Sequence, residues 1–181
     1  SVDELKELRG LGLKIAYLGA ESGDEEVLKK IRKGANYDQI VEAGRKLKQA
    51  GIITSVTVIL GLGGVECSGS HALATARILS DIDPDYAGAL TLMLKPGTPL
   101  YKDWKEGRFS LISPFQALME LKLIIENSNF TDCFFTANHA SNYLPIKVHL
   151  PEQKAATIKL IDDILDKRDM SQLRSEFTRA L

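Results

Sequence analysis

The residues best suited to chemistry stand at the ends of apolar runs, which is where parallel α/β proteins bind their ligands. The first such segment is GAESG (residues 19–23), which ends the run LKIAYLG and precedes a highly charged stretch. The Glu21 carboxylate can accept hydrogen bonds from a ribose or an ammonium group, and the Ser22 hydroxyl can donate or accept one. Ser22 also forms a capping-box pattern with Glu25, so it could instead cap the next helix. The two interpretations are compatible.

Two later segments have the same position after an apolar run. GLGGVE (residues 61–66) carries glycines that would let the backbone approach a flat ligand, although a plain strand-to-helix turn explains them about as well. It fails as a dinucleotide fingerprint, because Glu66 occupies the place of the last glycine in G-x-G-x-x-G. LMLKPGTP (residues 92–99) could offer an apolar face and main-chain polar groups to an aromatic base, or could be only a rigid turn. Together the three segments outline a site for an amphipathic ligand.

Other residues with evident chemistry are few, and the sequence contains no clear acid–base pair, nucleophile triad or metal cluster. Cys67 and Cys133 are far apart and form no C-x-x-C pair, which fits a reducing cytosol and predicts no self-contained metal site. His71 falls in a helical pattern and is expected on a helix surface. The loop NHASNY (residues 138–143) offers a weak substrate site, although its polar residues are also ordinary loop formers. The candidates in this loop are Asn138, His139 and Asn142.

Strand and helix signals alternate along the chain, which predicts an α/β fold. A parallel sheet with right-handed crossovers follows from this order, as part of a barrel or as a doubly wound sheet. We expect the first strand to be buried on both faces. Ser113, Pro114 and Gln116 predict a sharply defined helix start. The expected strands are residues 13–19, 54–64, 86–94 and, more weakly, 133–138.

About four strands with flanking helices cannot close an eight-fold barrel, which needs about 200 residues or more. The first strand should therefore have an uncovered edge, which could support self-association. The chain also begins at Ser1 rather than Met. Both features predict a fragment that lacks N-terminal strands. Within it, residues 1–168 are expected to form a partial barrel and residues 169–181 a short amphipathic helical tail.

The composition excludes several other classes of protein. The net charge is −1 and 26% of the residues are charged, so bulk charge gives no support for a nucleic-acid partner. No apolar run approaches the roughly 18 residues that a bilayer-spanning helix needs, and no signal peptide is visible. A cytoplasmic protein with a small-molecule ligand is the expectation.

The three strand-end segments, in this order and spacing, resemble the later half of the radical S-adenosylmethionine (radical SAM) enzyme core. The segments that carry the resemblance are LGAESGDEEVLKKIRKG (18–34), TVILGLGGVE (57–66) and GALTLMLKPGTPLY (88–101). Within this superfamily the chain is most similar to Fe–S oxidoreductases described as similar to oxygen-independent coproporphyrinogen oxidase, partly through NHASNYLP (138–145). The resemblance implies a parallel (β/α) partial barrel, half of a TIM-like barrel.

The resemblance also implies two cofactors. In that superfamily a [4Fe–4S] cluster held by three cysteines reduces S-adenosylmethionine (SAM), and the 5′-deoxyadenosyl radical that results abstracts hydrogen from a substrate. By position, Glu21 and Ser22 would touch the ribose or the methionyl part, and Arg32 could pair with the methionyl carboxylate or be a surface residue. The adenine would lie against the other two strand ends. The residues implied there are Ile59, Gly61, Gly63, Leu92 and Met93.

The sequence departs from the superfamily pattern in two places. The cluster motif C-x-x-x-C-x-x-C is absent, so no metal ligands are expected in this chain. The motif G-x-I-x-G-x-x-E is only loosely met, because Thr57 replaces its first glycine and Glu66 lies two places too far along. We therefore expect a fragment of a radical SAM oxidoreductase that carries SAM-binding strand ends and is inactive alone. The alternatives are a non-redox ligand-binding or regulatory domain, or an NAD-type oxidoreductase, against which the missing third glycine weighs.

Overall fold

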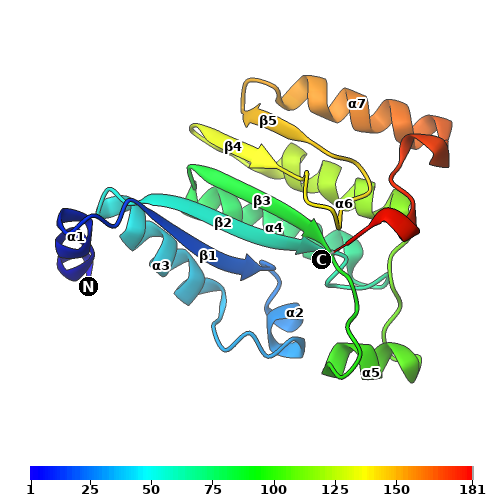
Figure 1. The fold of residues 1–181 in the computed structure, drawn as a ribbon, viewed down its shortest axis with the longest axis horizontal. Helices are drawn as coiled ribbons and strands as arrows, with labels where there is room; N and C mark the ends of the chain where they lie inside the picture. Colours follow the sequence, from blue (N-terminus) through cyan, green and yellow to red (C-terminus); the bar gives the residue numbers. More distant parts are fainter. Residues whose placement is uncertain (181) are drawn as a thin grey trace.

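The computed structural model describes residues 1–180, which form one five-stranded sheet in the order β1-β2-β3-β4-β5 (Figure 1). The first four strands are parallel, and β5 is antiparallel to β4. This arrangement confirms the predicted α/β fold and its parallel sheet. The strands are β1 (Ile15–Glu21), β2 (Ile53–Leu60), β3 (Tyr86–Thr91), β4 (Cys133–Thr136) and β5 (Lys147–Leu150).

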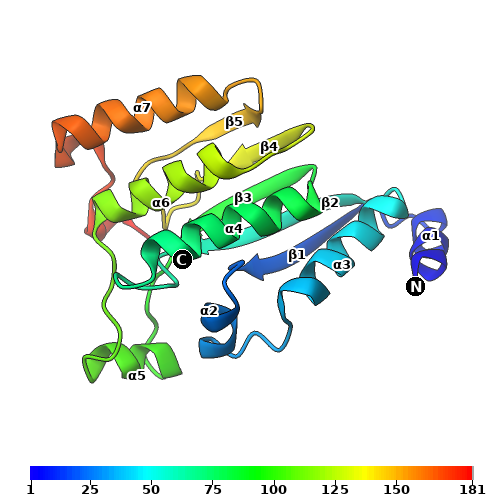
Figure 2. The same ribbon diagram turned by 180° about the vertical axis from the view of Figure 1, so that it is seen from behind.

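Three of the helices that connect the parallel strands, α3, α4 and α6, lie on one side of the sheet, whereas α2 and α5 lie beyond the carboxyl ends of the strands. Figure 2 shows α3, α4 and α6 in front of the strands, and α7 packs against α6 and β5. Strands that follow one another in sequence order, with their helices on the same face, form part of a barrel rather than a doubly wound sheet. The helices are α1 (Val2–Gly10), α2 (Glu25–Lys30), α3 (Tyr37–Gln49), α4 (Ser68–Ile82), α5 (Pro99–Lys105), α6 (Pro114–Asn127) and α7 (Lys154–Lys167).

The core lies between the sheet and this helical layer. Alternate side chains of β2, including Val56 and Val58, are fully buried against the helices, as strand geometry requires. Ala72 and Ala76 of α4 are also fully buried, and their small side chains let this helix approach the sheet closely. Phe135 of β4 is the largest of the fully buried side chains.

The opposite face of the sheet carries no helix of the described chain, as Figure 1 shows. Tyr17 on β1 is 76% exposed, so the prediction that this strand is buried on both faces is wrong. A helix on one side covers only every second residue of a strand. Strand pairing places Tyr17 in one row with a residue of each other strand. That row continues through Ser55, Tyr86, Phe134 and His149.

No strand was predicted at β5, because Lys147 and His149, which are exposed, interrupt its apolar pattern. The chain after α7 forms two single-turn 3-10 helices, η1 (Met170–Gln172) and η2 (Glu176–Thr178), where an amphipathic helical tail was expected. Within residues 1–180, no helix combines the length and apolarity needed to cross a bilayer.

Helix starts were predicted with mixed success. Ser113 caps α6 in a complete capping box with Gln116, as expected. The predicted capping box of Ser22 and Glu25 is wrong: Asp24 is the N-cap of α2, and its carboxylate accepts hydrogen bonds from two backbone amides at 2.9 and 3.1 Å. The Ser22 hydroxyl is therefore available for another contact, which lies in the protein interior.

Candidate ligand site at the strand ends

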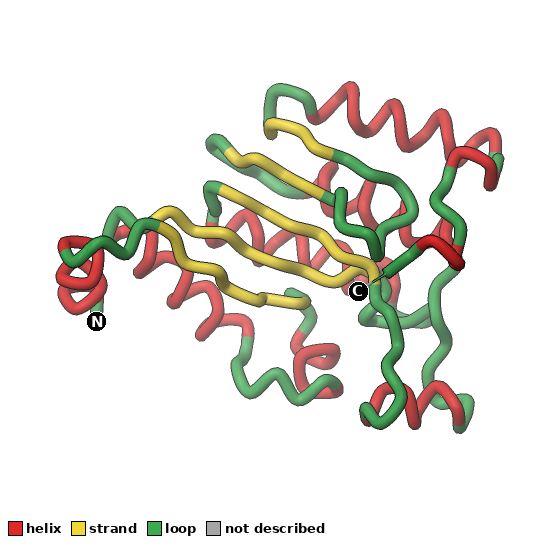
Figure 3. Tube along the Cα trace, in the orientation of Figure 1, coloured by secondary structure: helices red, strands yellow, loops and turns green. Residues whose placement is uncertain are grey.

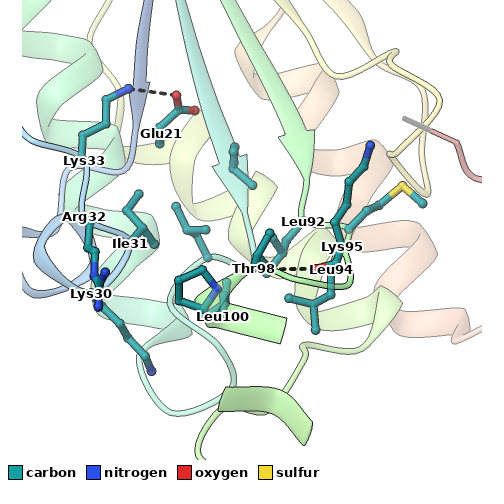
Figure 4. A pocket seen from close by; sticks show the side chains of 14 residues that line it. Glu21, Lys30, Ile31, Arg32, Lys33, Leu92, Leu94, Lys95, Thr98 and Leu100 are labelled. Atoms are coloured by element: carbon teal, nitrogen blue, oxygen red, sulfur yellow. Dashed lines mark hydrogen bonds and ion pairs between the residues drawn. The ribbon is translucent and has the colours of Figure 1, made fainter. Parts of the chain in front are cut away.

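The carboxyl ends of β1, β2 and β3 converge on one pocket. In Figure 3 the loops that follow these three strands gather at the same end of the sheet. The pocket has a volume of about 560 Å³, and Figure 4 shows its side chains approaching from the three strand ends and from the segment that begins α5. The residues that line it are Glu21, Lys30, Ile31, Arg32, Lys33, Ile59, Leu62, Leu92, Met93, Leu94, Lys95, Thr98, Pro99 and Leu100.

The pocket combines apolar walls with a charged rim. Ile59 and Leu62 come from the end of β2, and Leu92 faces them from the segment after β3. The only carboxylate among the lining residues is Glu21, which accepts a hydrogen bond from Lys33 Nζ at 3.0 Å. Both side chains of this ion pair are about a quarter exposed, at 23% and 24%. The pocket therefore offers apolar side chains beside an ion-paired carboxylate and several cations.

The backbone of the pocket is unusual at two of its charged residues. Glu21 has φ 65° and Arg32 has φ 56°, in the left-handed region that non-glycine residues seldom occupy. Strand pairing also becomes irregular between Gly19 and Glu21, which is the signature of a β-bulge that redirects a side chain. A side chain at Gly19 would place its Cβ 2.5 Å from Glu21 Oε1, so the glycine leaves room for the carboxylate. Such strained positions concentrate at functional sites.

A buried polar network lies behind the pocket wall and was not predicted. His71 on α4 is fully buried, with Nδ1 2.8 Å from Ser22 Oγ and Nε2 3.1 Å from the Ile59 carbonyl oxygen. The prediction that His71 lies on a helix surface is therefore wrong. Glu120 on α6 is also fully buried, and it accepts hydrogen bonds from the Gly61 amide at 2.6 Å and from Ser68 Oγ at 2.7 Å.

Burial changes the ionisation of both groups. It lowers the pKa of His71, against opposing effects of its hydrogen bond to the Ile59 carbonyl and of the Asp24 charge. Burial raises the pKa of Glu120 to about 7, although the hydrogen bonds from Ser68 and Gly61 favour the charged form. His71 is thus held neutral, and both forms of Glu120 are populated near neutral pH.

The sequence contained a signal for each of these residues. Glu120 lies between Ala117 and Ile124 on the apolar stripe of its helix, so a carboxylate there must face the core. His71 lies four residues before the buried Thr75 on the same face of α4. Which groups these side chains meet could not be read from helix periodicity.

The residues predicted to hold SAM divide into two groups. Glu21, Arg32, Ile59, Leu92 and Met93 all line the pocket. The other three lie outside its lining residues. Ser22 is fully buried against His71, Gly61 packs on Ile112 with φ +80°, and Gly63 lies against His71 and Cys67.

The predicted substrate loop lies apart from the pocket lining. Asn142 is only 2% exposed, accepts a hydrogen bond from Thr91 Oγ1 at 2.8 Å and donates one to the Ala89 carbonyl at 2.8 Å. Asn138 and His139 are exposed, and His139 Nδ1 contacts Ser141 Oγ at 2.9 Å. In this structure Asn142 ties the loop to the end of β3.

The described residues do not fit an iron–sulfur cluster. The chain contains two cysteines, of which Cys67 is exposed and Cys133 is buried in β4. Burial raises the pKa of the Cys133 thiol to about 12, so this side chain is held in its protonated form. Among residues 1–180, no three or more His, Cys, Asp or Glu side chains come together as a possible metal site.

The fold and the pocket define the class of protein: a parallel (β/α) partial barrel with a ligand pocket at the carboxyl ends of its strands. Comparison with known proteins gives a partial family match. Residues 1–66 match the model of the radical SAM superfamily, which confirms the resemblance predicted from the strand ends. The matched segment contains β1, β2 and the glycines that follow β2.

One curated relative and two solved structures extend this comparison. The relative is a tRNA uridine(34) acetyltransferase of Methanocaldococcus infernus (strain DSM 11812 / JCM 15783 / ME), 26% identical over 110 residues. These cover 60% of this chain and 21% of the relative, so the chain spans about a fifth of that protein. The structure of M. infernus Elp3 with an N-terminal deletion (1–46) has a TM-score of 0.66 at 19% identity, over 93% of this chain and 39% of that one. Methylornithine synthase (PylB) has a TM-score of 0.51 at 27% identity, over 72% of this chain and 37% of that one.

Proposed function

We propose that this chain is part of a radical SAM enzyme and that its strand-end pocket binds SAM. The convergence of three strand ends on one pocket, with Glu21 as its carboxylate, is the observation that carries the proposal. The radical SAM match over residues 1–66 and the partial-barrel fold support it.

The pocket offers a group for each part of SAM. Glu21 would accept hydrogen bonds from the ribose hydroxyls or from the methionyl ammonium group. Ile59 and Leu92 would lie against the adenine, and Arg32 or Lys95 would pair with the methionyl carboxylate. When SAM is bound in the complete enzyme, it supplies the 5′-deoxyadenosyl group for radical chemistry.

The cluster that reduces SAM would lie in a part of the enzyme outside this chain, because the described residues do not fit it. β1 is an edge strand of the described sheet. We propose that strands of the complete enzyme pair with this edge, which would otherwise favour association of two copies. The open face of the sheet would then line the interior of the barrel, where the substrate would lie.

Binding measurements on the 181-residue chain test the proposal. Isothermal titration calorimetry with SAM should show binding at one site, and NAD should not bind. Glu21→Gln should weaken SAM binding about tenfold, because a hydrogen bond to a charged group contributes about 1.5 kcal/mol or more. Glu66→Gln is the matched control, since Glu66 is exposed and lies outside the pocket lining.

Two results would refute the proposal. One is a wild-type chain that binds NAD tightly and SAM not at all, which would favour the NAD-type alternative. The other is a Glu21→Gln chain whose affinity for SAM equals that of the Glu66→Gln control. A non-redox binding domain would pass both tests, and the coding sequence upstream of Ser1 separates it from an enzyme. An enzyme requires C-x-x-x-C-x-x-C there.

A further inference from the structure

The half of β3 that leads into the pocket has no neighbouring strand on one side. Pairing with β4 covers only the first three residues of β3, whereas pairing with β2 covers all six. Two backbone groups beyond β4 bond to side chains of the loop 138–143 instead. The Ala89 carbonyl accepts a hydrogen bond from Asn142 Nδ2 at 2.8 Å, and the Thr91 amide donates one to Ser141 Oγ at 3.2 Å. This loop therefore takes the place of a strand beside the end of β3.

The segment after α7 is docked on the same loop. In Figures 1 and 2 this segment runs from α7 back to the end of β3. The Arg174 amide donates to the Tyr143 carbonyl at 2.8 Å, and Arg174 Nη1 donates to the His139 and Asn142 carbonyls at 2.9 and 3.0 Å. Leu173, one residue earlier, is buried in the hydrophobic core. Polar and apolar contacts thus hold the segment against the loop.

Arg179 extends this attachment to the pocket wall. Its side chain is buried, with Nε donating to the Ser141 carbonyl at 2.6 Å and Nη1 to the Tyr143 hydroxyl at 2.5 Å. The guanidinium carbon lies 4.1 Å from the centre of the Tyr143 ring, within cation–π distance, and an ion pair joins Nη1 to Glu176 at 2.7 Å. Nη2 donates to the Leu92 carbonyl at 3.2 Å. The planar guanidinium, with its several fixed donors, thus joins the loop and the segment after α7 to a residue that lines the pocket.

Leu92 is held through both of its backbone polar groups. Its amide donates to the Leu60 carbonyl at 2.9 Å, which extends the pairing of β2 with β3 by one residue, and its carbonyl accepts from Arg179. Met93 and Leu94 follow it along the pocket wall outside any helix or strand. Within residues 1–180, the backbone groups of these two residues form no hydrogen bond to the protein. The position of this part of the wall therefore depends on how Leu92 is anchored.

We propose that Arg179 is a positioning residue, which fastens the segment after α7 to Leu92 and so holds the β3 wall of the SAM pocket in place. The inference rests on the proposed SAM site, in which Leu92 lies against the adenine. It adds that SAM binding and docking of the segment after α7 favour each other. Such coupling is reciprocal, so the factor by which docking raises SAM affinity equals the factor by which SAM favours docking.

The first test uses the wild-type chain and measures docking by trypsin cleavage after Arg174. The Arg174 side chain is hydrogen-bonded in the docked segment, so cleavage there requires release of the segment. The cleavage rate is followed by mass spectrometry without ligand, with saturating SAM and with saturating 5′-methylthioadenosine, which keeps the adenine and ribose. We expect each ligand to slow this cleavage by about threefold to tenfold, the effect of one hydrogen bond from a charged group.

Cleavage after Lys6 is the internal control in the same digest. Lys6 is exposed on α1, which lies at the opposite end of the sheet from the pocket (Figure 1). Its cleavage rate should not change with either ligand. A merely structural role of Arg179 would leave cleavage after Arg174 equally independent of the ligand.

The second test measures affinity by calorimetric titration of variants. Arg179→Ala should bind SAM and 5′-methylthioadenosine about threefold to tenfold more weakly than the wild type, by the same factor as the protection from trypsin. Lys167→Ala is the matched control, because Lys167 is an exposed cation at the end of α7, and it should bind both ligands as the wild type does. Differential scanning calorimetry shows whether both variants are folded at the temperature of the titration.

The outcomes separate this inference from the proposed function. A wild-type chain that binds neither SAM nor 5′-methylthioadenosine would overturn the proposed function, and this inference with it. A wild-type chain that binds SAM without any slowing of cleavage after Arg174 relative to Lys6 would overturn this inference alone. The same conclusion would follow if folded Arg179→Ala bound SAM as tightly as Lys167→Ala.

Discussion

Gly23 provides the sharpest test of how the pocket is built, because it is the point where the exit of β1 touches α4. A Cβ atom at this position would lie 2.0 Å from the Ala74 carbonyl oxygen and 2.4 Å from its carbon. Both are backbone atoms of a helix, so no side-chain rotation can relieve the clash. The Gly23 amide also donates a hydrogen bond to Thr75 Oγ1 at 3.2 Å, which the same displacement would break.

The expected cost of Gly23→Ala follows from this geometry. Overpacking of a well-packed interior typically destabilises by 1–3 kcal/mol, and a clash with rigid backbone should lie at the upper end, about 3 kcal/mol. In a protein of this size each kcal/mol lowers the Tm by about 2–4 °C, so we expect a fall of roughly 6–12 °C. The displacement would also move Ser22 away from His71 and shift Glu21, so SAM affinity should fall.

Gly69→Ala is the matched control for this experiment. Gly69 lies on the same helix, α4, and a Cβ there would have no neighbour within 4 Å. Because alanine favours helix over glycine by about 0.5–1 kcal/mol, this variant should be as stable as the wild type or slightly more stable. Differential scanning calorimetry and SAM titration of both variants measure the effects. An unchanged Tm and affinity for Gly23→Ala would refute the claim that α4 fixes the exit of β1.

Two further predictions concern the tail and the missing cluster. Arg179→Ala should make the chain after α7 more sensitive to trypsin. The Arg179 guanidinium donates a hydrogen bond to the Leu92 carbonyl at 3.2 Å, and its side chain is only 5% exposed. An unchanged cleavage rate would show that other contacts hold this segment. Reconstitution of the chain with iron and sulfide should yield no cluster, because it offers one exposed and one buried cysteine; a stable visible absorption band with stoichiometric iron would contradict this.

The sequence was sufficient for four of the five strands and for much of the pocket. β-branched and apolar runs ended by glycine are local signals, so β2 and β3 were found within a few residues of their bounds. Parallel strands bring their carboxyl ends to the same edge of a sheet, which is why Glu21, Ile59 and Met93 could be placed together. The strands follow from local periodicity and their shared edge from strand direction, whereas the choice of individual pocket residues also used the resemblance to the radical SAM superfamily.

The tertiary structure decided which side of each element is covered. The helices α3, α4 and α6 lie on one face, which makes the sheet part of a barrel and leaves Tyr17 exposed on the other. Helix periodicity could not identify the partners of His71 and Glu120, because these come from segments 12 to 59 residues away in sequence. Asn142 likewise became part of the interior because Thr91 and Ala89 happen to lie opposite it. The hydrogen-bond partners of a buried polar side chain are the groups that packing places beside it, and only the folded structure determines which groups these are.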